Sequence, residues 1–588
     1  RRVLAIPELL ELVFVHLEDA DNAMNALVCK AWSEVALDLL WREVDDLEQA
    51  FSLLAPIVSS PEEEDVSGRR FSRPLEPHDW ARFVRYSSRV RTLEVASDVG
   101  EDRLRGAQVF DEIAQTRTSA HLFPKLSSLT WEAGRLRLSL MLMHENVKQF
   151  AVHLTPSPTY TFGVLFQDIA LRMPKLTKLD LRFEFSVREI EDDLCRLYSA
   201  LPKLKIVILP KFCITSRITE TLSRSEHIEV IQFEFFEHQG SGSAADITEW
   251  DPRLAEGAFP SLDDLSVSVH FPALLRFLSA PFFPRHLRKL YVHSINPESP
   301  AAVHEVVAAV VSACPRLTEF ALDYAGDPHP SPFRGGAAAP DEQLTLDTLR
   351  PLLAVPTLTT LTVNWDTPLA LAPADLDALA RAWPRLEHLE LSVAPVRAAV
   401  DPSGPPPLTL AALVPFARHC PRLRELGLFL AARAADVRPP TADALLLSGA
   451  GVAGVRFSPA LEWLHVGCSP IDDAEAVARF LSRVLPPGVR VSVDAGPGGR
   501  QWGRVAVEGE ADARAHAARR AETEAGAARW TEVARLLPPL ARVRAEERGR
   551  RAALEREVED LRMRCGVLEE RRAAGAAAAM VDEGCVLL

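Results

Sequence analysis

Apolar and acidic stretches alternate over the first 44 residues in the way that short amphipathic helices do. Pro7 suits the first turn of a helix, and after it apolar residues recur at helical spacing, at Leu9, Leu10, Val13, Phe14 and Leu17. Acidic residues between 18 and 21 interrupt this run, and a second one extends from Leu27 to Trp41. The pattern predicts a helical hairpin or trio that is too small to bury all of its own apolar residues.

A different pattern begins near residue 86 and continues to about residue 495. An apolar residue and a proline precede the phrase L-x-x-L-x-L, as in MPKLTKLDL from Met173 and CPRLRELGL from Cys420. Segments of helical periodicity separate the copies, and each ends just before the next proline, which stops the helix. The pattern predicts an α/β repeat with a strand and a helix in most units. The first apolar residue of the phrase falls at positions 90, 126, 147, 176, 204, 228, 262, 287, 317, 358, 386, 423 and 461.

The N-terminal segment resembles the F-box in the order and spacing of its residues. The similarity rests on Ile6-Pro7, the apolar helix that follows, the segment Leu27-Val28-Cys29-Lys30-x-Trp32 and Leu40-Trp41. The alternative is a helical cap that seals the end of a repeat domain, because such a cap also needs apolar faces. The resemblance implies binding to the Skp-type adaptor of a cullin-RING ubiquitin ligase, through Pro7, Leu9, Leu10, Phe14, Leu17, Val28 and Trp32.

The repeats resemble the leucine-rich repeats that often follow F-boxes. They lack the Asn or Cys expected after each strand, where residues such as Gly134 and Glu184 stand instead. The alternative is a set of unrelated α/β units with a doubly wound sheet. The predicted fold is therefore a helical F-box (residues 1–50), a linker (51–85) and an irregular leucine-rich repeat solenoid (86–495), followed by a helical tail.

In such a solenoid, side chains that point outward from the parallel strands form an extended surface for proteins or peptides. Aromatic and mixed polar groups at these positions are suited to carrying interface energy. The register predicts a target-binding face made by Tyr291, His293, Asp323, Asn364, His388, Glu390, Phe429, Trp463 and His465.

The tail is rich in Ala, Arg and Glu, and Pro538-Pro539 is expected to divide residues 505–572 into two helices. Beyond the prolines, apolar residues at spacings of four and three predict a short coiled coil and weak self-association, and the alternative is one helix packed on the repeats. Residues 573–588 are expected to be a flexible tail. It ends in a C-a-a-X pattern that predicts a prenyl group on Cys585 and weak membrane association.

Charge, cysteine spacing and motifs limit the kinds of partner and site that the chain is expected to have. The net charge of -15 argues against a nucleic-acid partner, since phosphate binding needs a concentrated basic surface. The eight cysteines form no C-x-x-C pair, which argues against a zinc site and a disulfide framework. We find no phosphate-binding loop, nucleophile elbow or H-E-x-x-H pair, and we therefore expect no catalytic residue, no metal and no cofactor.

The location is expected to be cytoplasmic or nuclear, because no asparagine begins an N-x-[ST] sequon and no apolar stretch approaches the roughly 20 residues of a membrane span. A short leader is expected before Arg1, which lies inside the first motif. The predicted function is that of a substrate-recognition subunit of an SCF-type ubiquitin ligase. It would act by proximity, with an unknown protein as its target. The alternative is a non-ligase interaction scaffold, tethered to a membrane by the prenyl group.

Overall fold

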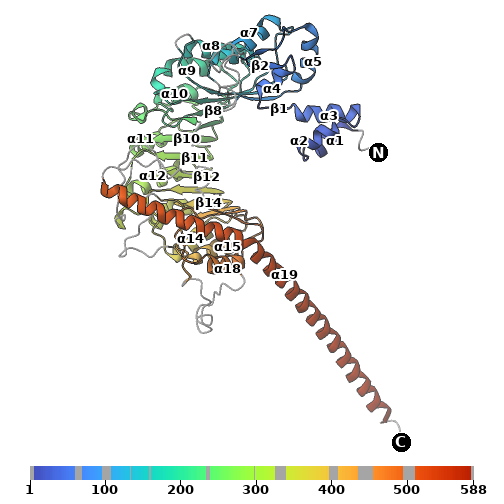
Figure 1. Ribbon diagram of the computed structural model, residues 1–588. Coiled ribbons are helices and arrows are strands. Elements are labelled where there is room, and N and C mark those ends of the chain that lie inside the picture. The colour runs from blue at the N-terminus through green and yellow to red at the C-terminus, as the bar shows by residue number, and fades with distance from the viewer. Residues whose placement is uncertain are drawn as a thin grey trace. The chain divides into compact units, whose positions relative to one another are not determined.

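The structure is a computed structural model (Figure 1). It divides into two compact units, Arg1–Tyr324 and Ala325–Leu588, which are described separately. It describes residues 6–59, 69–95, 107–132, 134–157, 160–233, 239–296, 298–324, 340–395, 408–434, 455–493 and 510–583.

The first unit begins with three short helices, α1 (Pro7–Phe14), α2 (Asp19–Asn25) and α3 (Lys30–Leu40). Strand β1 (Glu43–Val44) follows α3 and pairs in parallel with β4 (Thr92–Val95), so the chain leaves the helices directly into the sheet. The helical trio that the apolar pattern predicts is present.

The stretch between β1 and β4 is folded wherever the structure describes it, which differs from the linker expected over residues 51–85. It contains α4 (Leu47–Ser52), an antiparallel pair of β2 (Ile57–Ser59) with β3 (Arg69–Phe71), and α5 (Pro77–Ser87). Trp80 and Phe83 of α5 are buried at 2% and 1% exposure. Trp80 and Phe83 can be buried to this extent only by packing against other parts of the fold. The acidic and proline-containing composition of the segment predicts a loop and gives no sign of this packing.

In the part of the chain that the structure describes, fifteen parallel strands follow one another in chain order, ten in the first unit and five in the second. In the first unit β4 is followed by β5 (Ser128–Trp131), β6 (Gln149–His153), β7 (Lys178–Arg182), β8 (Ile206–Leu209), β9 (Val230–Phe233), β10 (Asp264–Val269), β11 (Lys289–Ser294) and β12 (Glu319–Asp323). The second unit holds β13 (Thr360–Asn364), β14 (His388–Leu391), β15 (Glu425–Leu428), β16 (Trp463–His465) and β17 (Arg490–Ser492).

Helices lie between most of these strands, with short 3₁₀ turns in several connections. The helices of the first unit's repeats are α7 (Ala107–Thr116), α8 (Phe162–Arg172), α9 (Glu191–Ala200), α10 (Ser216–Ser223), α11 (Phe271–Leu278) and α12 (Pro300–Ala313). Those of the second unit are α13 (Leu346–Leu349), α14 (Pro373–Ala382), α15 (Leu413–His419), α18 (Ala474–Val484) and the long α19 (Glu510–Glu583). The architecture is that of leucine-rich repeats, and the predicted fold class is confirmed.

The repeat phrase places the strands accurately. All thirteen predicted first positions, from Val90 to Leu461, lie two residues before a strand, and each is at most 3% exposed. The next two apolar positions of each phrase alternate along the strand and point to the same side, as Leu389 and Leu391 do at 2% and 3% exposure. One core therefore runs behind the strands of each unit.

Serine hydroxyls hold two of the turns that follow strands in the second unit. Ser392 Oγ accepts from the backbone N–H of Trp365 at 3.1 Å and donates to the carbonyl of Val363 at 3.3 Å. Ser469 Oγ likewise accepts from Leu430 N at 2.9 Å and donates to Leu428 O at 3.3 Å. A side chain that both donates and accepts can thus connect neighbouring turns where the usual Asn is missing.

Helix α19 is continuous through Pro538 and Pro539, so the expectation of two helices was wrong. Four buried residues of α19 flank the two prolines. Before them lie Trp530, Val533 and Leu537, and after them lies Ala541; each is 3% exposed or less. Trp530 Nε1 also donates to Ser469 O at 2.8 Å. Packing on the same surface before and after the prolines keeps the two halves aligned despite the lost backbone bonds.

Candidate functional site

The three N-terminal helices enclose a small apolar core. Leu10 and Phe14 of α1 are 2% exposed and pack against Val35 and Ala36 of α3. The rings of Phe14 and Trp32 meet edge to face, with centroids 5.3 Å apart. These contacts use only one side of α1, since residues four apart on a helix share one face.

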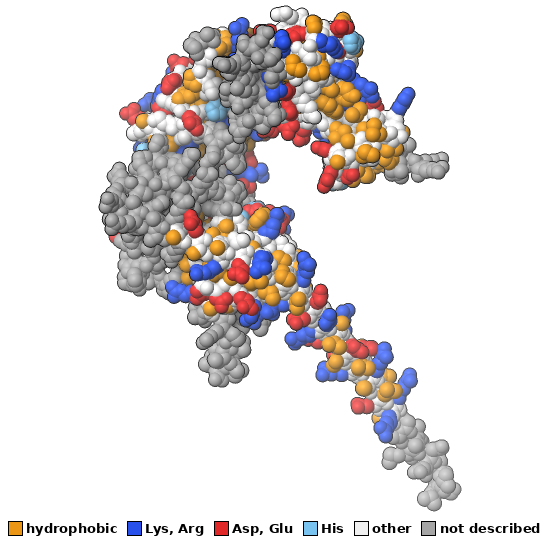
Figure 2. Space-filling view, in the orientation of Figure 1, with side chains coloured by type: hydrophobic (Ala, Val, Ile, Leu, Met, Phe, Trp, Pro, Cys, Tyr) orange, Lys and Arg blue, Asp and Glu red, His pale blue; other side chains and the backbone are white. Residues whose placement is uncertain are grey.

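The other side of α1 is also apolar and faces solvent. Ile6, Leu9 and Val13 are 43%, 37% and 53% exposed and recur three and four residues apart. Figure 2 shows apolar side chains gathered over the region of α1, α2 and α3. We call this group the N-terminal apolar surface, and it consists of Ile6, Leu9, Leu12, Val13, Val15, Leu17, Met24, Leu27 and Val28.

The structure therefore separates the predicted adaptor-binding residues into two groups. Leu10 and Phe14 lie inside the helical core, where they support the surface without forming it, and Trp32 is partly buried against that core. The exposed members are Pro7, Leu9, Leu17 and Val28. Leu12 and Leu27, at 63% and 79% exposure, belong to the surface but were not predicted, although helical spacing from Leu9 would have indicated Leu12.

Direct contacts join the helical trio to the repeats of the first unit. The backbone N–H groups of Arg91 and Thr92 donate to the carbonyl of Arg42 at 2.9 and 3.0 Å. The Arg89 guanidinium forms ion pairs with Glu34 and Asp38 of α3, and it also donates to the carbonyl of Glu34 at 3.1 Å. The pair with Arg89 lowers the pKa of Glu34.

The strand face of the first unit is a ladder of polar and aromatic side chains. In-phase pairing places Asp264, Lys289 and Glu319 in one row across β10, β11 and β12. Lys289 Nζ lies 2.7 Å from Glu319 Oε1. Burial raises the pKa of Asp264 to about 6, against the lowering effects of Lys289 and of the hydrogen bond that Gln232 donates to it at 2.7 Å.

The second unit presents a more aromatic cluster on its strand face. One row crosses β14 to β17 as His388, Glu425, Trp463 and Arg490. The Arg490 guanidinium carbon lies 3.9 Å from the centroid of the Trp463 ring, which His465 stacks at 5.8 Å. Nδ1 of His388 and Nε2 of His465 lie 3.4 and 3.7 Å from Glu425 Oε2. We call these five residues the β14–β17 cluster.

Four predicted target-binding residues, His388, Glu390, Trp463 and His465, are thus neighbours on one face. Tyr291 and Asn364 are partly exposed at their predicted positions. Arg490 and Glu425 were missed, and the signal for both was their register beside the predicted Trp463.

Three residues predicted to face the target are buried instead. The rings of Phe212 and Phe233 cover His293 (2% exposed) at centroid distances of 5.7 and 6.4 Å. Asp323 is 3% exposed and accepts a hydrogen bond from the hydroxyl of Tyr291. Phe429 is 6% exposed in the packed turn after β15. The strand alternation gives the face of each side chain, but it does not show what covers that face.

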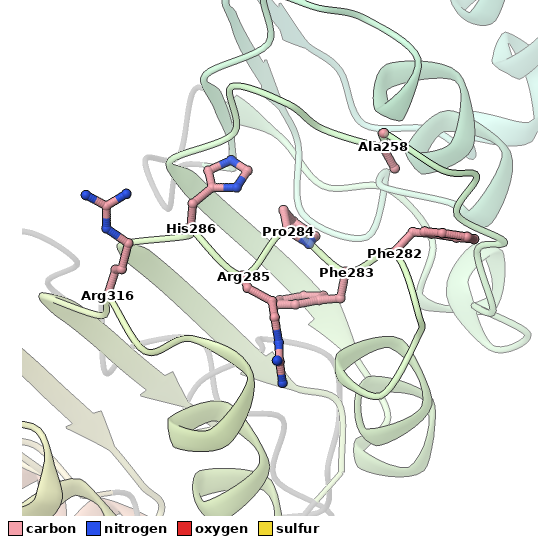
Figure 3. A pocket seen from close by; sticks show the side chains of 8 residues that line it. Ala258, Phe282, Phe283, Pro284, Arg285, His286 and Arg316 are labelled. Carbon is pink, nitrogen blue, oxygen red and sulfur yellow. The ribbon is translucent and has the colours of Figure 1, made fainter.

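An open depression lies where the chain enters strands β10 to β12 (Figure 3). Phe282, Arg285 and His286 line it beside Arg316, and Phe282 is 41% exposed. Small-molecule sites enclose most of their ligand, which this open form does not do. The depression is a surface feature of the first unit.

His121, His144 and Glu145 approach one another closely enough to be compared with a metal site. However, His144 Nε2 lies 2.9 Å from the carbonyl of Phe123, and Nδ1 accepts from Asn146 N at 3.2 Å. Burial lowers the pKa of His144, which favours the neutral ring that this bonding requires. Both ring nitrogens are therefore already engaged.

The predicted prenylation site, Cys585, lies outside the described residues. Among the helices that the structure describes, none combines the length and apolar character needed to cross a bilayer.

The described chain thus combines a small helical module that has an exposed apolar surface with a run of leucine-rich repeats. Residues 7–46 match the F-box-like family model. The chain therefore contains an N-terminal F-box-like domain followed by leucine-rich repeats. No curated protein sequence matches the chain.

Solved structures of similar architecture include the Rad7 and Elc1 complex in yeast, at 12% identity and a TM-score of 0.34, covering 66% of this chain and 82% of the other. A TLR13–ssRNA13 complex matches at 12% identity and a TM-score of 0.31, covering 69% of this chain and 50% of the other. The leucine-rich repeat-containing protein LegL7 from Legionella pneumophila matches at 12% identity and a TM-score of 0.28, covering 62% and 96%.

Proposed function

We propose that this chain is the substrate-recognition subunit of an SCF-type cullin-RING ubiquitin ligase. The F-box-like domain binds a Skp-type adaptor, and the leucine-rich repeats bind a protein target. The observation that carries the proposal is the N-terminal apolar surface, which is formed by residues within or next to the F-box-like match. Its nine large apolar side chains stay exposed after the domain has formed its own core, as expected of a binding surface.

In this role the chain performs no bond chemistry. The adaptor connects the chain to the enzymes that transfer ubiquitin, and the repeats hold the target beside them. Tethering turns a bimolecular encounter into an intramolecular one, and this is the source of the rate gain.

The adaptor interaction is tested by changing exposed residues and leaving the core intact. We expect the full chain carrying Leu9→Ser, Leu12→Ser and Val13→Ser to bind a purified Skp-type adaptor at least about 100-fold more weakly than the parent, since three apolar contacts are lost. Isothermal titration measures the affinity. Leu171→Ser is the matched control, because Leu171 is 80% exposed on α8 and should leave binding unchanged.

Circular dichroism of the triple variant should match the parent, which separates a lost contact from a lost fold. Equal adaptor binding by parent and triple variant, or no binding by either, would refute the adaptor role.

The target-binding role is supported by the β14–β17 cluster, where anionic, aromatic and cationic groups stand side by side in one row. Trp and Arg are enriched among residues that dominate interface energies. We expect Trp463→Ala with Arg490→Ala to lose target proteins that copurify with the parent and are ubiquitylated in its presence, while the adaptor is retained. Unchanged target recovery would show that another face is used.

A scaffold without a ligase partner is the second candidate function, and one observation favours it. Helix α19 carries seven further exposed large apolar residues, which indicates a second binding surface independent of the F-box-like domain. Retention of other partners by a chain that binds no Skp-type adaptor would support the scaffold.

A further inference from the structure

Residues 551–573 of α19 form a helical stretch in which every residue is exposed. The helix is docked through Trp530 and its neighbours up to Ala541, whereas residues 551–573 are exposed throughout. The exposed fractions of Leu554, Val558 and Leu561 are 61%, 44% and 51%, and Leu568 is 62% exposed. Such a face is a candidate for a partner helix.

The spacing of these residues gives a heptad register. Leu554, Val558, Leu561, Cys565 and Leu568 follow one another at alternating intervals of four and three, and we call them the seam. Leucine then occupies every d position, and Val558 and Cys565 occupy the a positions. Leucine at d with a β-branched residue at a favours parallel two-stranded coiled coils.

The charged residues beside the seam fit a second copy of the same helix. In a parallel dimer each g residue faces the e residue five positions later on the other copy. The three resulting pairs are all of opposite charge: Arg550 with Glu555, Glu557 with Arg562, and Arg564 with Glu569.

Two of these residues already have partners within the helix. Arg551 lies 2.9 Å from Glu555, and Arg564 lies 2.9 Å from Asp560. These are exposed pairs that contribute little and can rearrange.

We propose that the seam forms a parallel, in-register coiled coil with a second copy of this chain. The docked half of α19 already orders the helix in the single chain. Association of two copies therefore loses less conformational entropy than association of two disordered segments would. Arginines at the flanking a positions, 551 and 572, end the seam by placing like charges together. About two heptads of apolar layers make a dimer that dissociates on dilution. The proposal does not depend on adaptor binding.

An antiparallel pair is the competing arrangement, and charge alone does not exclude it. In that arrangement g faces g and e faces e, so Glu557 would meet Arg564 and Glu555 would meet Arg562. An exchange of two charges distinguishes the arrangements. Glu557→Arg with Arg562→Glu restores the parallel pair, but creates an Arg–Arg and a Glu–Glu contact in the antiparallel one.

Sedimentation velocity of the full chain, under reducing conditions and over a range of concentrations, provides the test. We expect a concentration-dependent dimer that Leu561→Lys abolishes. The matched control is Met563→Lys, two residues away at an f position with 64% exposure, and it should dimerise like the parent. Glu557→Arg and Arg562→Glu should each raise the dissociation constant about tenfold, and the double variant should return it near the parent value.

Cross-linking gives a second readout, because the parallel register places Cys565 opposite Cys565 of the second copy. Diamide accepts two electrons and two protons from the two thiols, which form one S–S bond. A covalent dimer should appear with the parent and with Cys29→Ser, but not with Cys565→Ser. Cys29 is the other exposed cysteine among the described residues.

A monomer at all concentrations would overturn the proposal, as would a dimer that survives Leu561→Lys. A dimer that the double charge exchange weakens further, and that gives no Cys565 cross-link, would establish the antiparallel arrangement instead. Adaptor titration of Leu561→Lys should be unchanged, so failure of the coiled coil and failure of the adaptor role are distinguishable.

Discussion

Asp264 offers a pH-dependent test of the strand face. Its carboxyl lies in the row with Lys289 and Glu319, and burial raises its pKa from the ordinary 3.8 to about 6. Between these values the folded chain binds a proton that the unfolded chain does not. The free energy of unfolding therefore falls as the pH rises through this window. At pH 7.5 the stabilisation that the bound proton on Asp264 provides is lost completely.

A pKa raised from 3.8 to about 6 can change the free energy of unfolding by at most about 3 kcal/mol, because each pKa unit corresponds to about 1.4 kcal/mol. Asp264→Asn keeps the shape and an oxygen that can accept from Gln232, but it cannot ionise. We expect the variant to be more stable than the parent by about 1 to 3 kcal/mol at pH 7.5 and to lose this advantage near pH 4.

Urea unfolding at both pH values measures the difference, and hydrogen exchange of the β10 and β11 amides locates it. Asp263→Asn is the control, since it removes the same charge at the neighbouring residue but breaks the 2.6 Å ion pair with Arg288. The control should be about 0 to 1 kcal/mol less stable at pH 7.5. A destabilised Asp264→Asn at pH 7.5 would refute the reasoning, because it would show that the ionised carboxylate is favourable there.

Three further substitutions test the packing inside each unit separately. Trp530→Ala should destabilise the second unit by about 3 to 5 kcal/mol in urea unfolding, with Trp530→Phe much milder, because the indole fills a site at 1% exposure. Gly427→Ala should cost about 1 to 3 kcal/mol in the same assay, since its Cβ would lie 2.7 Å from Val393 Cγ2; an unchanged midpoint would mean that β14 and β15 can separate freely. Asp79→Ala should destabilise the first unit by about 1 to 2 kcal/mol at pH 7, because it removes both the pair with the half-exposed Arg73, whose contacts are 2.6 and 2.7 Å long, and the hydrogen bond that caps α5 from Glu76 N. That hydrogen bonding to Arg73 lowers the pKa of Asp79, so its contribution is complete above pH 3.8 and is lost as the pH falls further; a parent whose acid unfolding matches that of Asp79→Ala would contradict this assignment.

The repeats were predictable because one core position recurs in every unit. The position two residues before the strand of each predicted unit, held for example by Leu176 and Leu386, is buried and must be apolar. The proline before it stops the preceding helix. The folded segment around Trp80 was not predictable, since it occurs once and its composition is that of a loop. The continuity of α19 through Pro538 depends on tertiary packing of Trp530 and Leu537, which local rules do not include.

The candidate surfaces were predictable in part for related reasons. Helical spacing identifies both sides of α1 as apolar, but it does not show which side the neighbouring helix covers, so Leu10 and Leu9 look alike in the sequence. Strand alternation correctly places Trp463 and His465 on one face. It does not reveal that rings from other strands cover His293, because that contact depends on residues far away in the chain.

The pairing of β1 with β4 bears on which lysines of a target the proposed ligase would modify. The F-box-like domain is joined to the repeats of the first unit by a strand pair and by the ion pairs of Arg89, with only two residues between α3 and β1. A flexible linker would let the target sample many orientations, and many of its lysines would be reached in turn. A hydrogen-bonded joint holds the first repeats in one orientation to the F-box-like domain. For a target that contacts these first repeats, selection among its lysines would depend on this geometry, and inserting glycines after Val44 should broaden the set of lysines that receive ubiquitin.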